Sequence, residues 1–324
     1  MIAALVAAVA GVWFGVKALF PDSSKPAADP HGPVITVKIP EGTDASGIGS
    51  ILEDEGVVED GGRFRNYAKD QGEGADFKAG TYQFRAGSDY DVIIAQLDKG
   101  PTAAPVSKLV IPEGFRTTEI ADRVTTVGMN RAAYLAAVTA APFPPGFGHH
   151  RIHEGFLFPA TYDVKRNEPP SELVTEQMAA FEDAFSQVDM SYAESKNLTP
   201  YDVLTIASMI EREARVDSER KLIAAVIYNR LHLHMPLGID ATLLYEQGSW
   251  THKLTVSELH ADTPYNTRVN LGLPPTPICN PGLASLQAAA HPANVDYLYY
   301  VAKGDSGHHY FTDNYQDFLA HAGG

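Results

Sequence analysis

The stretch TPYDVLTIASMIEREA, residues 199–214, predicts a helix around which the rest of the chain is organised. Thr199 is a good N-cap, Pro200 suits the first helical position, and Asp202 stands where a capping box places its acid. At 100° per residue, five small or apolar side chains share one face of this helix. These five are Val203, Leu204, Ala207, Ile210 and Ala214.

One acidic residue, Glu211, falls inside that apolar stripe, whereas Glu213 lies toward its other edge. A carboxyl on a core-facing stripe is costly to ionise, so we expect its pKa to be raised. A general acid that works near neutral pH needs a raised pKa. The alternative is a structural ion pair with one of the nearby arginines. These are Arg215, Arg220 and Arg230.

The composition excludes some classes of partner. The 324 residues have room for two or three domains, and 44% hydrophobic and 20% charged residues are ordinary for a globular protein. The net charge of −15 argues against nucleic acid as a partner, because phosphate binding needs a basic surface, but it does not exclude an uncharged glycan. The single cysteine, Cys279, provides neither a disulfide framework nor a cysteine metal cluster.

The first 20 residues are predicted to form a transmembrane anchor. Residues 2–16, IAALVAAVAGVWFGV, carry no charge, and with the residues beyond Lys17 the apolar run reaches about 19 residues, just enough to span a bilayer. A signal peptide is the alternative, but neither a basic n-region nor a small-residue cleavage site is clear. A Pro/Ser/Ala linker follows at 21–33.

Residues 34–104 predict a small β-α-α-β module. VITVKI (34–39) and GTYQF (80–84) read as strands, with helices at 45–55 and 62–71 between them and a further helix from Ser88 to Leu97. The tetrapeptide Ile-Pro-Glu-Gly occurs at 39–42 and again at 111–114. Each copy follows a strand and precedes a helix, and we interpret this repeat as structural.

Residues 105–324 predict a mixed α/β domain. It contains an aromatic strand-like segment at 153–164, an amphipathic helix at 171–188, the helix of residues 199–214, and a helix capped by Ser218. A long loop at 263–282, a helix at 283–291 and a strand at 297–302 complete it.

Two kinds of catalytic site are compatible with these residues. Glycan cleavage needs a proton donor, for which Glu211 is the candidate, and Glu213, Asp240 or Glu154 could supply a second carboxylate. A zinc site could instead use the histidines that stand beside Glu154. They are His149, His150 and His153, and their spacing matches no metal motif. We therefore predict no metal and no cofactor.

Several strings occur in the order typical of one known family. They are EGFLFPATY (154–162), ASMIERE (207–213), SERKLIAAVIYNRL (218–231), IDATLLY (239–245), TPYNTR (263–268), GLPPTPICNPG (272–282) and AAAHP (288–292). In these strings the chain resembles the YceG-like endolytic murein transglycosylases, the MltG family. The resemblance covers roughly residues 34–320 and is densest between 154 and 312.

The resemblance implies a membrane-anchored enzyme of the cell wall. Its catalytic domain would lie on the extracytoplasmic side of the cell membrane and cut the MurNAc–GlcNAc β-1,4 bond of nascent peptidoglycan strands, leaving a 1,6-anhydro-MurNAc end. The family's catalytic acid corresponds to Glu211, and the muramyl 6-hydroxyl acts as the nucleophile. The module at 34–104 would be LysM-like, and a peptidoglycan synthase would be a partner.

The resemblance also implies substrate contacts. Tyr265 and Asn266 belong to a string that lies by the family's cleft, and Asp240 and Glu154 are further candidates for contacts to the sugars. Family members often carry Gln and Ser or Thr where this chain has Gly238 and Ile239, so sugar contacts from those two positions are not expected here.

The sequence thus predicts an α+β fold with an N-terminal transmembrane helix, a LysM-like β-α-α-β module and a mixed α/β catalytic domain. From the residues alone, a non-catalytic scaffold that binds peptidoglycan at the membrane is the alternative to an enzyme. The position of Glu211 within the apolar stripe favours the enzyme.

Overall fold

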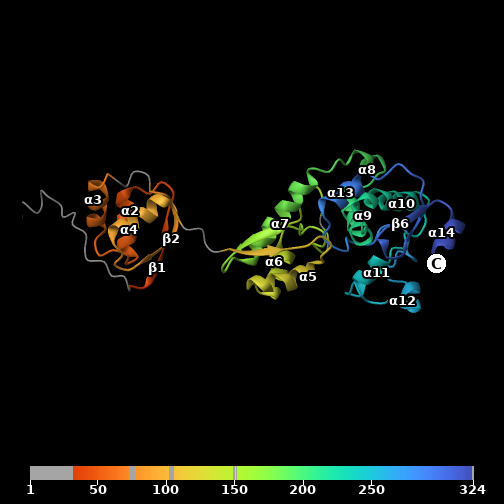
Figure 1. The fold of residues 1–324 in the computed structure, drawn as a ribbon, viewed down its shortest axis with the longest axis horizontal. Coiled ribbons are helices and arrows are strands. Elements are labelled where there is room, and N and C mark those ends of the chain that lie inside the picture. The colour runs from red at the N-terminus through yellow and green to blue at the C-terminus, as the bar shows by residue number, and fades with distance from the viewer. Residues whose placement is uncertain (1–31, 73–76, 102–105, 149, 151, 323–324) are drawn as a thin grey trace, which may run out of the picture. The chain divides into compact units, whose positions relative to one another are not determined.

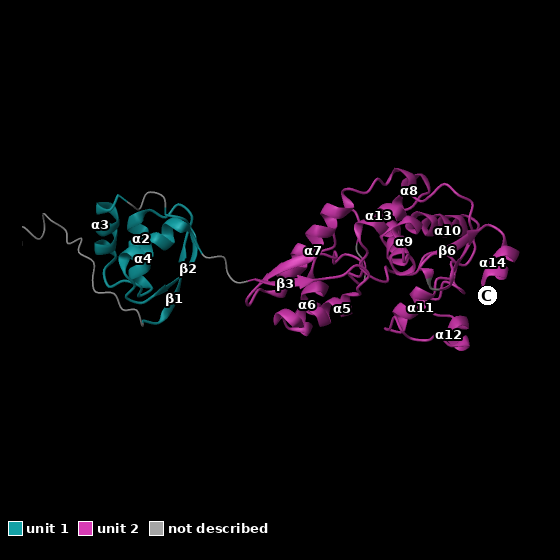
Figure 2. Cartoon of the chain, viewed as in Figure 1, with its two compact units in different colours: residues 1–104 teal, residues 105–324 magenta. Residues whose placement is uncertain are grey.

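The computed structural model describes residues 32–72, 77–101, 106–148, 150 and 152–322. The chain forms two compact units, residues 1–104 and residues 105–324, which are coloured separately in Figure 2. Helices and strands occur in both units, so the fold is α+β.

One part of the predicted fold class is wrong. None of the helices within the described ranges is long and apolar enough to cross a membrane. The predicted transmembrane helix at residues 1–20 and most of the linker at 21–33 lie outside the described residues. The fold class of the described residues is α+β.

Unit 1 is a two-stranded sheet covered by three helices (Figure 1). The strands pair antiparallel, with Val37 opposite Tyr82, and alternate residues such as Val37, Ile39 and Phe84 face a core of their own. Asp44 and Asp60 accept hydrogen bonds from backbone N–H groups at the starts of the first two helices, which fixes where those helices begin. The elements are β1 Val34–Ile39, α2 Ala45–Asp54, α3 Gly61–Asp70, β2 Gly80–Arg85 and α4 Tyr90–Lys99.

Unit 2 begins with a second antiparallel sheet, which packs with helices on a shared core. Leu109 of its first strand lies opposite Tyr162 of its second strand, and both side chains are buried in that core. This part consists of β3 Val106–Val110, α5 Thr117–Arg123, the 3₁₀ turn η1 Val124–Val127, α6 Arg131–Ala140, β4 Thr161–Lys165 and α7 Pro170–Phe185.

The rest of unit 2 is mainly helical and ends in a hairpin and a short helix (Figure 1). The hairpin pairs Tyr300 with Phe311. These elements are α8 Ser191–Ser195, α9 Pro200–Glu213, η2 Asp217–Glu219, α10 Arg220–His232, α11 Asp240–Glu246, α12 Val256–His260, α13 Leu283–Ala290, β5 Tyr299–Ala302, η3 Gly304–Ser306, β6 His309–Thr312 and α14 Tyr315–Ala322.

Helix α9 is the central helix of unit 2. Its capping box is confirmed, because Thr199 Oγ1 accepts from Asp202 N at 3.2 Å and Asp202 Oδ2 accepts from Thr199 N at 2.8 Å. The expectation of a single buried stripe is wrong, since every residue from Val203 to Ile210 is buried. The reason is that α10, α11 and α13 all pack against α9 and leave no free face along this stretch.

Three predicted boundaries also differ from the structure. Of the strand-like segment 153–164, only Thr161–Lys165 is a strand, because the Asn280 side chain bonds the backbone N–H groups of Gly155 and Leu157 and replaces a neighbouring strand there. The cap of α4 is Asp89 rather than Ser88. A 3₁₀ turn occupies Asp217–Glu219, so α10 begins at Arg220.

Candidate active site

Glu211 lies in the last turn of α9, and its carboxylate is held by three donors. Its Oε2 accepts from Gly282 N at 3.0 Å and from Ser285 Oγ at 2.8 Å, and its Oε1 accepts from Arg220 Nη1 at 3.2 Å. Only 7% of the side chain is exposed. The donors come from the start of α10 and the start of α13, so the orientation of this carboxyl depends on three helices meeting.

Arg220 is therefore the arginine that forms the ion pair with Glu211. Its guanidinium also donates to Ser285 Oγ at 2.6 Å and to Asp217 Oδ1 at 3.2 Å, and only 11% of its side chain is exposed. An ion pair with an orienting arginine is compatible with a structural and with a catalytic carboxyl. The ion pair with Arg220 shows that the orientation of the Glu211 carboxylate is fixed.

Two extended segments meet beside Glu211. Gly114 N donates to Asn280 O at 2.9 Å, and Asn280 N donates to Phe115 O at 2.9 Å, so the two segments are paired at this point. Gly114 packs against Glu211 and Arg212, and one residue earlier in the chain Glu113 reaches Gly282. Burial raises the pKa of Glu113, and the negative charge of Glu211 raises it further. The sequence offered no signal for this second carboxyl, because Glu113 belongs to a repeated tetrapeptide that we interpreted as structural.

Glu154 lies farther along the same pair of segments and is almost completely buried. Its Oε1 accepts from Thr117 N, Thr117 Oγ1 and Asn280 Nδ2 at 2.9–3.1 Å, and its Oε2 accepts from Tyr245 OH at 3.2 Å. Burial raises the pKa of Glu154 to about 7, although these hydrogen bonds oppose the shift. A cavity of about 230 Å³ adjoins Glu154, with Thr117, His153 and Tyr245 in its wall.

Of the two residues in the predicted sugar-binding string, only Tyr265 has an exposed part. Its hydroxyl shares a hydrogen bond of 2.9 Å with Thr276 Oγ1, and its ring lies 5.2 Å from that of Tyr245. Asn266 has no exposed surface, and its amide donates to three backbone carbonyl oxygens, including that of Ala261 at 2.7 Å. In this conformation the Asn266 amide holds its own loop together, and a sugar has no access to it.

Asp240, the remaining predicted contact, stands at the start of α11 and forms an ion pair of 2.7 Å with Arg268. Among the described residues, no hydrogen bond or ion pair joins Asp240 to Glu211.

Glu213 is one helical half-turn from Glu211 and accepts a hydrogen bond of 3.0 Å from Tyr300 OH in β5. Burial raises the pKa of Glu213. The two glutamates of α9 thus have separate environments, Glu211 toward α13 and Glu213 toward the hairpin.

An aromatic residue that the sequence reasoning missed lies next to these groups. The guanidinium of Arg212 stacks 3.9 Å above the Trp250 ring, and that of Arg116 lies 5.0 Å from it. Trp250 Nε1 donates to Glu119 Oε2 at 3.0 Å. These contacts fasten the loop after α11 to the start of α5, next to the backbone of Gly114, whose carbonyl accepts from Arg212 at 3.4 Å.

The histidines are engaged in packing and in hydrogen bonds. His153 stacks on Phe143 and shares a hydrogen bond with a backbone carbonyl, and His150 stacks on Tyr201. His149 lies outside the described residues. Within the described part of the chain, no group of three or more His, Cys, Asp or Glu side chains could hold a metal ion.

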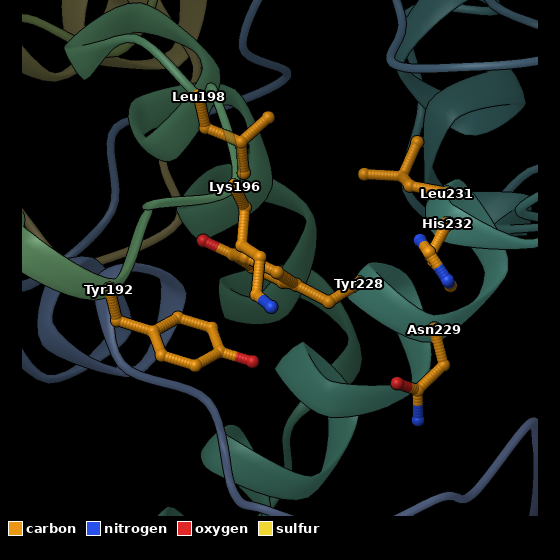
Figure 3. A pocket seen from close by; sticks show the side chains of 7 residues that line it. All are labelled: Tyr192, Lys196, Leu198, Tyr228, Asn229, Leu231 and His232. Atoms are coloured by element: carbon orange, nitrogen blue, oxygen red, sulfur yellow. The ribbon is translucent and has the colours of Figure 1, made fainter. Parts of the chain in front are cut away.

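A second cavity, of about 300 Å³, lies at the C-terminal half of α10 (Figure 3). Three of its polar side chains have partners inside the protein. Asn229 donates to the carbonyl oxygens of Val295 and Tyr297, Tyr228 donates to that of Ala289, and the Lys196 ammonium lies over a tyrosine ring. We therefore assign no ligand to this cavity.

Comparison with known proteins identifies the family. The sequence matches the YceG-like family over residues 37–323. The chain belongs to the YceG-like family. This match includes the segments that carry Glu211, Glu113, Glu154 and Gly282.

Similar YceG-like proteins include two that are named endolytic murein transglycosylase. The one from Streptococcus pneumoniae serotype 2 (strain D39 / NCTC 7466) is 33% identical over 340 residues, which cover 95% of this chain and 61% of the relative. The one from Bacillus subtilis (strain 168) is 33% identical over 289 residues, covering 84% of this chain and 79% of the relative. This chain thus spans about three fifths of the length of the pneumococcal protein.

A solved structure has the same fold. The crystal structure of a yceG-like protein from Listeria monocytogenes aligns with a TM-score of 0.60 and 34% sequence identity, over 89% of this chain and 99% of that chain.

Proposed function

We propose that this YceG-like protein is an endolytic murein transglycosylase that cuts the MurNAc–GlcNAc β-1,4 bond within peptidoglycan strands and leaves 1,6-anhydro-MurNAc ends. Membership of the family and the names of its relatives support this activity. The observation that carries it is the geometry of Glu211, a nearly buried carboxyl that Arg220, Gly282 and Ser285 hold in one orientation.

The fixed orientation of this carboxyl suits the role of proton donor. Cleavage of a glycosidic bond requires a proton on the leaving oxygen as an oxocarbenium-like centre develops. When Glu211 gives up its proton, the Arg220 guanidinium, the Gly282 N–H and the Ser285 hydroxyl stabilise the carboxylate that forms. The muramyl 6-hydroxyl then closes the anhydro ring, so no water and no protein nucleophile is needed.

The experiment compares the two glutamates of α9. Glu211→Gln keeps the shape of the side chain but removes the titrating proton, so we expect the release of anhydro products from uncrosslinked glycan to fall by about 10²–10⁴-fold. Glu213→Gln is the matched control and should keep most of the activity, because Glu213 contacts Tyr300 and not the donors around Glu211.

Other outcomes would contradict the assignment. If Glu213→Gln is inactive and Glu211→Gln is fully active, Glu213 is the proton donor and Glu211 is not. If wild type and both variants bind glycan but release no anhydro product, the protein is a peptidoglycan-binding scaffold.

We further propose a location and a protein partner for this activity. Peptidoglycan is built outside the cytoplasmic membrane, so the catalytic unit would act on the extracytoplasmic side, where cutting a nascent strand would end its elongation. A peptidoglycan synthase, which extends that strand, is the protein partner that fits this activity. A reporter enzyme that is active only outside the cytoplasm, fused after residue 324, would test the location, and an inactive fusion would contradict it.

A further inference from the structure

The repeated tetrapeptide Ile-Pro-Glu-Gly forms the same turn in two different surroundings. Its glycines, Gly42 and Gly114, have φ angles of 75° and 77°. In unit 1, a Cβ added to Gly42 would meet nothing within 4 Å, and Glu41 lies on the exposed surface. In unit 2, the same addition to Gly114 would meet Arg212 and Glu211. The turn is therefore local, but what its glutamate contacts depends on the unit in which it stands.

The carboxyl of Glu113 lies directly against Gly282. A Cβ built on Gly282 would be only 1.8 Å from Glu113 Oε1, so Glu113 fills the space that any side chain at 282 would need. The N–H of the same Gly282 donates to Glu211 Oε2 at 3.0 Å. Standard bond lengths then place the two carboxyl oxygens within about 8 Å of each other. Paired catalytic carboxyls of glycosidases are roughly 5–9.5 Å apart.

The two carboxyls differ in access. The Glu211 side chain is 7% exposed, and both of its oxygens accept hydrogen bonds inside the protein. Glu113 as a whole residue is exposed, but its carboxyl end packs against Gly282 and is partly shielded from water there. A sugar hydroxyl that approaches this place can therefore meet Glu113 while Glu211 serves another oxygen.

The surroundings of Glu113 shift its pKa above the ordinary value of a glutamate. Burial raises the pKa of Glu113, the negative charges of Glu211 on α9 and Asp217 on η2 raise it further, and the Arg220 guanidinium at the start of α10 lowers it. Arg212 is the other charged group nearby, and its guanidinium stacks on Trp250.

We propose that Glu113 is a second catalytic carboxyl, which takes the proton from the muramyl 6-hydroxyl while Glu211 protonates the leaving oxygen. This inference rests on the proposed transglycosylase function. As the C1–O4 bond breaks, its electron pair goes to O4, which receives the proton of Glu211. The muramyl O6 bonds to C1 and its proton passes to the Glu113 carboxylate. The net change in the protein is one proton moved from Glu211 to Glu113, and exchange with water restores the starting state.

The main experiment compares Glu113→Gln with Glu41→Gln, which makes the same change in the other copy of the tetrapeptide. We expect kcat for anhydro-product release to fall at least 100-fold in Glu113→Gln, with little change in KM or Tm. Glu41→Gln should remain within about twofold of wild type, because a contribution of 10²–10⁴-fold belongs to a group that transfers a proton.

A pH profile separates proton transfer from a structural role. A base works only when it is deprotonated, so kcat of the wild type should rise with pH through the pKa of Glu113. This acid limb should be absent in Glu113→Gln and retained in Glu113→Asp, which keeps a carboxyl. Gly282→Ala provides an independent test, because its Cβ displaces the Glu113 carboxyl while its N–H remains available to Glu211.

Three results would overturn this role. One is a kcat of Glu113→Gln within threefold of Glu41→Gln. Another is a Glu113→Asp variant with the same loss and the same pH profile as Glu113→Gln, which would make the role one of shape. The third is wild-type protein that releases no anhydro product, which would overturn the proposed function as well, whereas the first two leave that function intact.

Discussion

The buried carboxyl of Glu154 should make the stability of unit 2 depend on pH in a direction opposite to that of a salt-bridged carboxylate. Burial raises the pKa of Glu154 from 4.5 to about 7. Between these two values the unfolded chain has lost the proton while the folded protein still holds it. The free energy of unfolding therefore falls as pH rises from about 4.5 to about 7 and is level above that range. At 1.36 kcal/mol per pKa unit, this cost reaches roughly 3 kcal/mol.

Glu154→Gln tests the free energy that is lost when the buried Glu154 ionises, because an amide cannot ionise. Its oxygen can accept the hydrogen bonds of Thr117 and Asn280, and the Tyr245 hydroxyl, which donates to Glu154, can accept from the new NH₂ group. The variant should match wild type near pH 4.5 and be more stable by roughly 3 kcal/mol at pH 8.

The assay is denaturant unfolding from pH 4.5 to 8.5, followed by the fluorescence of Trp250 in a Trp13→Phe background. Trp250 contacts Arg116 and Arg212 and so reports on unit 2. Other raised carboxyls, such as Glu113, are present in both proteins and cancel in the difference. A difference that stays constant over this pH range, or that favours wild type as pH rises, would refute the reasoning.

Three further predictions concern the surroundings of the site. Asn280→Ala removes four side-chain hydrogen bonds and should lower the free energy of unfolding by about 3–5 kcal/mol. A loss below 1 kcal/mol in the same unfolding assay would contradict this prediction. Arg220→Gln leaves the Glu211 carboxylate without its cation and should lower the free energy of unfolding by about 3–5 kcal/mol at pH 8. The same variant should lower kcat more than it raises KM. Unchanged kcat and stability would contradict the orienting role of Arg220. Incubation with EDTA should change neither product release nor Tm, and a large loss of either would revive the zinc site.

Interactions close in the chain account for what could be predicted locally. The capping box of α9 joins residues three apart, and the burial of Val203, Leu204, Ala207 and Ile210 follows from the helical period. The strands of unit 1 follow in the same way from alternating side chains, since period and burial are linked by backbone geometry. These features need no knowledge of the distant chain.

Distant contacts explain where the predictions went wrong. Residues 153–160 carry strand-forming side chains, but Asn280, more than 120 residues away in the sequence, takes up their backbone donors. Asn266, which the family resemblance suggests as a sugar contact, donates its amide to carbonyl groups five to eight residues away, and its contact with a sugar stays a prediction. Side-chain type alone does not reveal which partner a polar group finds.

The sequence by itself determined the α+β class of the described units, the cap and period of α9, and the position of Glu211 on that helix. Only the tertiary structure decided that Arg220, Gly282 and Ser285 surround Glu211, and that Glu113, unlike Glu41, stands beside it. The physical reason is that a turn or a cap depends on hydrogen bonds within a few residues. The environment of a carboxyl depends on which distant segments pack around it, and identical tetrapeptides in the two units are therefore given different neighbours.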